Sequence, residues 1–187
     1  MIYTTLAKIR QHDPCTGSWE RLLASLDKTK ADDEPLSMGY ILETLGVADC
    51  LWAFQSIPDQ IKIAKVFACD CAEHVLPIFD KKRPEDQRPR KCIEVSRKFI
   101  NGEATADELD KARRAAYAAY AVDAAAYAVD AAADAAAAAG YAVDADAADA
   151  AAYAAGAADA ADDAADDDER QWQKDTLSKA LSKGTRS

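Results

Sequence analysis

The sequence has no Lys or Arg between Ala115 and Glu169, a stretch of 55 residues. Those residues include 32 Ala and 13 Asp or Glu, whereas the whole chain of 187 residues has a net charge of −10. The rest of the chain is therefore net positive by three charges. An excess of acid without a basic face argues against direct binding to nucleic acid or to an anionic membrane.

Long apolar runs are also missing. No run of about 20 strongly apolar residues could cross a bilayer, and Lys8 and Arg10 lie where a signal peptide would have its apolar stretch. We therefore expect a cytoplasmic protein with no membrane contact. The five cysteines form an odd, irregularly spaced set, so we expect reduced thiols rather than a disulfide scaffold.

Metal and catalytic motifs are scarce. Cys69, Cys71 and His74 invite a zinc interpretation, but on a helix the two cysteines would lie about 200° apart, which leaves too few ligands. No familiar catalytic or nucleotide-binding motif is present. The best carboxylate cluster, Glu73 with the nearby Asp70 and Asp80, is typical of an exposed helix face. We therefore predict no enzyme activity, no metal and no cofactor.

Helical periodicity dominates the first part of the chain, and no stretch alternates with period two. We predict one helix that ends near Gly46, a second that begins at Pro58 and a third that ends at Asn101-Gly102. Pro77 is expected to kink or end the helix that contains it. The predicted fold class is all-α: a helical N-terminal part followed by long Ala-rich helices packed as a hairpin or bundle.

Composition changes sharply near residues 101–103. We predict a helical globular region over residues 1–103 and an Ala/Asp-rich helical region over residues 104–187, with one continuous domain as the alternative. Thr105 and Glu108 have the spacing of a capping box and should start a helix. Trp172, Leu177 and Leu181 predict a C-terminal helix that docks on the core.

The Ala-rich segment carries one stripe of tyrosines and aspartates. The heptad Tyr-Ala-Val-Asp-Ala-Ala-Ala begins at Tyr120 and again at Tyr127, so the stripe residues lie three, four or seven positions apart on one helix face. A denser acidic run follows it. The predicted partner-binding residues are Tyr120, Asp123, Tyr127, Asp130, Asp134, Tyr141 and Asp144 in the stripe, and Asp159, Asp162, Asp163, Asp166 and Asp167 in the run.

This stripe has three interpretations. It is a solvated face that keeps an Ala-rich helix in solution, an interface for a protein with a basic surface, or a mimic of nucleic acid. Duplex DNA carries one charge per roughly 1.7 Å, whereas 13 acids on a helix about 80 Å long give one per about 6 Å. Mimicry therefore requires two such helices side by side, in a hairpin or a homodimer.

Several motifs resemble a known family. Residues 71–80 (CAEHVLPIFD), 84–90 (PEDQRPR) and 101–105 (NGEAT), together with the Ala-rich tract, are similar to the Imm5-like immunity proteins. The segments HDPC at 12–15, WERLL at 19–23 and KTKADDEPL at 28–36 resemble Ala-rich proteins encoded by phages and prophages. This resemblance implies an all-helical, non-catalytic protein of toxin or defence conflicts that acts by binding.

The sequence therefore predicts a phage- or prophage-type binding protein that neutralises a toxin, nuclease or other defence effector. Its function would be immunity or counter-defence, exerted through the acidic Tyr/Asp surface. The alternative is a structural protein whose Ala-rich helices mediate assembly.

Overall fold

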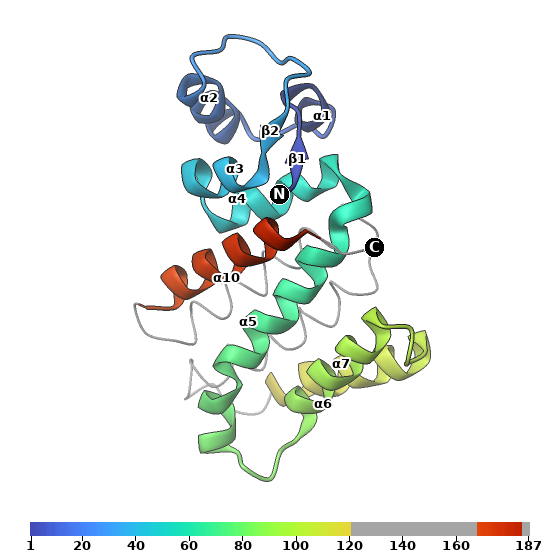
Figure 1. Cartoon of the computed structure of the whole chain (residues 1–187). Coiled ribbons are helices and arrows are strands. Elements are labelled where there is room, and N and C mark those ends of the chain that lie inside the picture. Colours follow the sequence, from blue (N-terminus) through green and yellow to red (C-terminus); the bar gives the residue numbers. More distant parts are fainter. Residues whose placement is uncertain (121–167, 185–187) are drawn as a thin grey trace.

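The computed structural model describes residues 1–120 and 168–184 (Figure 1). These residues are mainly helical, with a single two-stranded sheet, which confirms the all-α prediction. The α-helices are α1 (Leu6–Arg10), α2 (Thr16–Ser25), α3 (Met38–Leu45), α4 (Val47–Ala53), α5 (Ile61–Lys82), α6 (Arg88–Ile100), α7 (Ala106–Tyr120) and α10 (Glu169–Lys183). Two 3₁₀ turns, η1 (Phe54–Ser56) and η2 (Pro58–Gln60), link α4 to α5.

A minimal sheet joins the start of the chain to α3. Strands β1 (Tyr3–Thr4) and β2 (Leu36–Ser37) pair antiparallel, with Tyr3 opposite Ser37. At two residues each they do not alter the fold class. Thr4 is buried, and its hydroxyl lies 2.6 Å from that of Ser56, so this edge is tied to η1.

The predicted stop at Gly46 is confirmed. Gly46 caps α3 with a φ of 94°, a conformation that side-chain-bearing residues rarely adopt. Its N–H donates to the carbonyl of Leu42. Helix α4 then begins at once, so this residue sets the angle between two buried helices.

Helix α5 is the central element, and the expected start near Pro58 is confirmed by η2. Of the two alternatives expected at Pro77, an end of the helix is wrong, because α5 continues to Lys82; a kink there stays a prediction. Proline removes one backbone hydrogen bond, but Pro77 is exposed, whereas Val75, Leu76 and Phe79 around it are buried. Burial of these neighbours holds the helix together across the proline.

Helices α6 and α7 form a helical hairpin. Helix α6 ends at Ile100, and Gly102 adopts a φ of 76° in the turn, as the Asn-Gly pair predicts. The capping box is confirmed: the N–H of Glu108 donates to the Thr105 hydroxyl over 3.2 Å, and the Thr105 N–H donates to the Glu108 carboxylate over 2.8 Å.

Helix α10 returns to the first part of the chain and lies across α5 next to α3 and α4 (Figure 1). Leu177 and Leu181 are buried and Trp172 packs against the core, which confirms the predicted docking helix. One hydrophobic core contains residues from Ile2 to Leu181. Within the described ranges, no helix has both the length and the apolar character needed to cross a membrane.

Candidate interaction site

The predicted Tyr/Asp stripe lies almost wholly outside the described residues. Tyr120 is the last residue of α7. The other stripe residues and the acidic run fall between 121 and 167. The stripe therefore stays a prediction, and the described helices show how the two ends of this segment are held.

Helix α7 holds the first end. Leu109 and Ala116 are fully buried and Ala112 is nearly so, at the spacing of one helical face packed against α6. Arg113 and Arg114 both form ion pairs with Asp110. The last basic residues before the acidic segment are thus engaged within α7 itself.

A polar cluster formed by His74, Glu169, Trp172 and Gln173 holds the second end. The His74 Nδ1 lies 2.6 Å from Glu169 Oε2, and the Gln173 side-chain amide donates to Glu169 Oε1 over 3.1 Å. The Glu169 side chain is fully buried, so a carboxylate without these donors would be costly. Both carboxylate oxygens are therefore paired at the first residue of α10.

The same histidine stacks on Trp172. The two ring centroids are 3.8 Å apart and the planes differ by 4°. His74 lies on α5, so one side chain joins the central helix to the first turn of α10. The sequence could not indicate this contact, because His74 and Glu169 are 95 residues apart.

The structure places Cys69 and Cys71 in the core, where neither thiol is suited to bind a metal. Both are fully buried, and burial raises the pKa of the Cys69 thiol to about 12 and that of Cys71 further. Protonated thiols are poor ligands and poor nucleophiles. Within the described residues, no group of three or more His, Cys, Asp or Glu side chains could hold a metal ion.

The acidic residues near His74 pair with arginines of α6. Arg97 donates to Asp70 over 2.8 Å and to Glu73 over 2.5 Å, and Arg90 pairs with Asp80. Burial raises the pKa of Asp70, and the hydrogen bond from Arg97 opposes that rise. These ion pairs join α5 to α6, so the acidic residues near His74 have a structural role.

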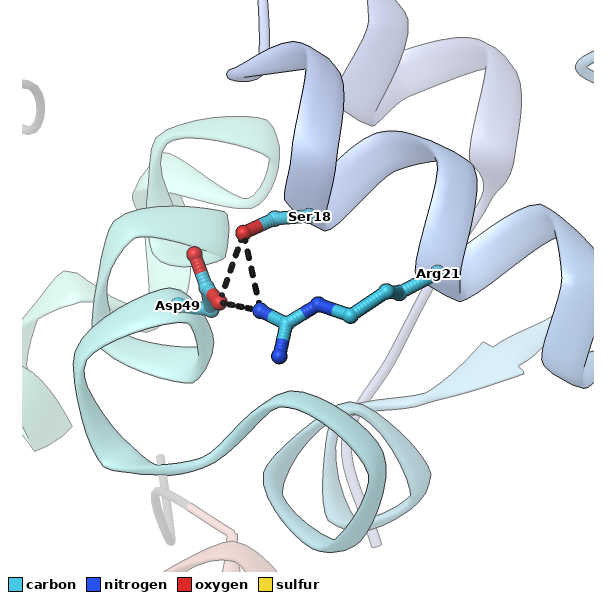
Figure 2. Close-up of polar contacts among 3 residues, drawn as sticks. All are labelled: Ser18, Arg21 and Asp49. Carbon is cyan, nitrogen blue, oxygen red and sulfur yellow. Dashed lines mark hydrogen bonds and ion pairs between the residues drawn. The ribbon is translucent and has the colours of Figure 1, made fainter.

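A second polar cluster, which the sequence did not indicate, joins α2 to α4 (Figure 2). The Ser18 hydroxyl donates to Asp49 over 2.8 Å, and Arg21 donates to the same carboxylate oxygen over 3.3 Å. A nucleophilic serine needs a base that accepts its proton, commonly an imidazole. Among the described residues, Ser18 donates not to an imidazole but to a carboxylate that Arg21 also binds. The cluster therefore joins two helices.

A small apolar cavity of about 70 Å³ lies beside this cluster, lined mainly by Trp19, Leu22, Ile41 and Trp52. Cys15 lies at its edge and is exposed. The Ser18 hydroxyl, which can turn from Asp49 towards Cys15, lowers the pKa of the Cys15 thiol, with a further contribution from the Ser18 backbone. Cys15 is therefore chemically unlike the four buried cysteines.

The model of one protein family, described as "Imm-5 like putative immunity protein", matches residues 58–180. The chain belongs to this family. The Imm-5 like match begins at η2, includes the acid-only segment and ends within α10. Comparisons with curated proteins and with solved structures gave no match.

Membership confirms the resemblance to the Imm5-like family found in the sequence. The family's description indicates immunity proteins, a class that is generally non-catalytic and whose members bind a protein partner. Helices α1 to α4, with the Ser18 cluster and the apolar cavity, precede the Imm-5 like match. The His74 cluster lies inside it. The contacts that fix both ends of the acidic segment are thus part of the family region.

Proposed function

We propose that this Imm-5 like protein neutralises a toxin or defence effector by stoichiometric binding. The bound surface is the Tyr/Asp stripe with the acidic run that follows it, and the partner presents a basic surface. The observation that carries this proposal is the extent of the family match, which spans the acid-only segment together with the helices on either side of it.

Charge supports the proposal. The segment from Ala115 to Glu169 has 13 acids and no base, so its charge is not neutralised by neighbours in sequence. An acidic surface speeds association with a basic partner and disfavours acidic competitors. The five tyrosines of this segment are suited to act as anchors, since aromatic side chains contribute much of the binding energy in protein interfaces.

The anchoring of the segment supports it as well. Leu109 and Ala116 fix α7, whereas Glu169 and Leu177 fix α10 in the same core. Holding both ends reduces the entropy that an interface must lose when it binds. An acidic segment tied in this way is better prepared for a defined partner than a free acidic tail.

The first experiment identifies the partner. The tagged full chain is used to recover proteins from native host lysate, with and without phage infection, and the bound fraction is washed at low and at high salt. We expect one protein in stoichiometric amount that high salt releases. Recovery of the bait alone, or of virion proteins that resist salt, would favour an assembly role.

The second experiment tests the surface. Changing Asp123, Asp130, Asp134 and Asp144 to Asn should weaken binding of the recovered partner and flatten its salt dependence. The matched control changes four exposed acids elsewhere to amides: Glu20→Gln, Asp33→Asn, Asp59→Asn and Glu85→Gln. Both variants gain four charge units, so equal affinities would contradict the proposed surface.

DNA mimicry is the narrower form of this proposal. It requires the partner to use one basic site for both the acidic segment and duplex DNA. Duplex DNA should then displace the chain from the partner in a competition assay. If duplex DNA does not change the binding, the mimicry hypothesis is rejected, whereas neutralisation by binding is not.

A further inference from the structure

Helix α10 is attached to the core by a thin apolar contact. Its buried side chains recur every four residues, so they form one stripe along the helix. Leu177 and Leu181 in this stripe are apolar, whereas Glu169 and Gln173 are polar. Helix α5, which α10 crosses (Figure 1), buries ten side chains, all of them in the hydrophobic core. Burial therefore stabilises the position of α10 much less than that of α5.

Pockets lie along both halves of α10. One of about 300 Å³ lies between its first turns and the junction of α3 and α4, where Leu42 and Val47 line it. Another of about 270 Å³ lies between its last turns and α5, where Phe67 and Ala180 line it. Helices with pockets between them make fewer van der Waals contacts than closely packed helices. The packing of α10 is therefore weak as well.

The charged contact between α10 and α3 adds little. Lys174 pairs with Glu43 over 2.7 Å, but the glutamate side chain is 63% exposed. Exposed ion pairs of this kind contribute little to stability, because water solvates both partners almost as well when they are apart.

The polar contact between α10 and α5 is stronger. The buried carboxylate of Glu169 accepts from Gln173, which belongs to α10 itself, and its other oxygen lies 2.6 Å from the His74 Nδ1. An ionised carboxylate can only accept, so the Nδ1 carries the proton. In the described part of the chain, His74 is thus the donor that reaches this carboxylate from outside α10. Water replaces that donor when α10 moves away, so the buried position depends on it.

From these contacts we infer that α10 is a releasable latch. It opens from α3, α4 and α5 as a unit while the rest of the core stays folded, and the hydrogen bond from His74 to Glu169 sets how often it opens. The latch is a conformational device of the chain alone and does not depend on the proposed function. If that function holds, the latch controls one end of the acid-only segment, because α10 follows this segment in sequence.

The rest of the core has its own support. Helix α3 packs on α2 and α4, and α5 packs on α6 and on both 3₁₀ turns. Within the described ranges, α10 contributes Leu177 and Leu181 to the buried apolar residues, and all the others lie between residues 2 and 116. A core of this size can remain folded as a cooperative unit when one peripheral helix opens.

The test is hydrogen exchange of the native full chain, followed by mass spectrometry of peptides from α10 and from α5. After correction for intrinsic rates, α10 amides should exchange at least roughly tenfold faster than those of α5. Urea below the unfolding transition should speed exchange in α10 less than in α5, because opening of one helix exposes less surface. Equal exchange and equal urea response in the two helices would overturn the inference.

Variants of His74 separate the hydrogen bond from the ring contact. His74→Phe keeps a ring against Trp172 but has no donor, so α10 should exchange roughly tenfold faster while α5 is unchanged. His74→Asn keeps a donor near the same position and should have a smaller effect. Ser18→Ala is the matched control, since it removes the donor to Asp49 in the α2–α4 cluster and should leave α10 unchanged. Equal acceleration of α10 and α5 in His74→Phe would contradict a separate opening.

Trypsin gives a second readout that the acid-only segment does not disturb, because no Lys or Arg lies between residues 115 and 169. Lys174 lies inside α10 and Lys65 inside α5. Cleavage within a helix requires local unfolding, so the chain should be cut after Lys174 before it is cut after Lys65. His74→Phe should speed the first cut and not the second. Earlier cleavage after Lys65 would count against the latch, and since no partner is present, it would leave the proposed neutralisation untouched.

Discussion

The imidazole of His74 lies parallel to the indole of Trp172, with 3.8 Å between ring centroids, while its Nδ1 contacts the buried carboxylate of Glu169. One side chain of α5 thus makes a ring contact and a polar contact with a single turn of α10. Because α10 follows the acidic segment directly, these contacts determine where that segment rejoins the core.

Replacing Trp172 with Ala should destabilise the protein by about 2 kcal/mol, because it removes both the stack on His74 and a large apolar contact. Trp172→Phe should cost less than half as much, since a phenyl ring can still stack. Urea unfolding followed by circular dichroism measures both variants. Equal losses for Ala and Phe would show that ring stacking contributes nothing.

Replacing Pro77 with Ala should stabilise the protein by about 1–3 kcal/mol. The change restores a backbone donor within α5 and removes the helix penalty of proline, against a smaller entropic gain of the unfolded chain. Pro77 is exposed, so the replacement opens no cavity. The midpoint of urea unfolding reports the effect, and a lower midpoint would mean that the proline fits a distortion α5 requires.

The five thiols should differ in reactivity towards a disulfide reagent at pH 8. Cys15 is exposed and the Ser18 hydrogen bond lowers its pKa, whereas burial raises the pKa of Cys92 to about 11 and those of Cys50, Cys69 and Cys71 further. One thiol should therefore react rapidly in the native chain and all five after unfolding.

Two variants identify the fast thiol. Cys15→Ser should abolish the rapid phase, and Ser18→Ala should slow it by removing the hydrogen bond that favours the thiolate. Absorbance of the released thiol follows both reactions. A rapid phase that persists without Cys15 would mean that one of the buried cysteines is accessible.

The capping box should contribute to acid sensitivity. Hydrogen bonds from Thr105 hold the pKa of Glu108 below its usual value of 4.5. A carboxyl whose pKa is lower in the folded state stabilises the fold above its unfolded pKa, and this contribution disappears as pH falls through the folded pKa. Urea unfolding of the native chain and of Glu108→Gln at pH 7 and pH 3 should show a difference that shrinks at pH 3.

A companion variant tests the hydroxyl of the same box. Thr105→Ala should cost about 1 kcal/mol at pH 7 and somewhat less at pH 3. It removes the acceptor for the Glu108 N–H, which does not titrate, and also a hydroxyl donor to the Glu108 carboxylate, whose contribution fades as that group is protonated. If Glu108→Gln were equally destabilising at both values of pH, the charge of the carboxylate would be irrelevant to the cap.

Local signals in this sequence predicted local structure well. The Thr105 and Glu108 spacing, Gly46 and the Asn101-Gly102 pair each act over a few residues, and each gave the helix boundary that the structure has. The prediction at Pro77 was wrong in part, because the cost of a proline inside a helix is outweighed by the burial of Phe79 and its neighbours. No local pattern in the sequence indicates that burial.

Contacts across the chain were beyond sequence reasoning. His74 meets Glu169 over 95 residues and Ser18 meets Asp49 over 31, and neither pair belongs to a recognisable motif. Lys91 and Lys111 likewise lie on different helices, and only the packing of α6 on α7 places them around one pocket. The Tyr/Asp stripe itself remains a prediction.

The stack of His74 on Trp172 also gives the protein a natural optical probe. Because the indole is in ring contact with His74, emission from Trp172 reports the closeness of α10 to α5. Trp19 and Trp52 line the apolar cavity beside the Ser18 cluster and can be replaced by Phe to isolate the signal of Trp172. Docking of the helix that follows the acidic segment can then be followed in real time without an attached dye.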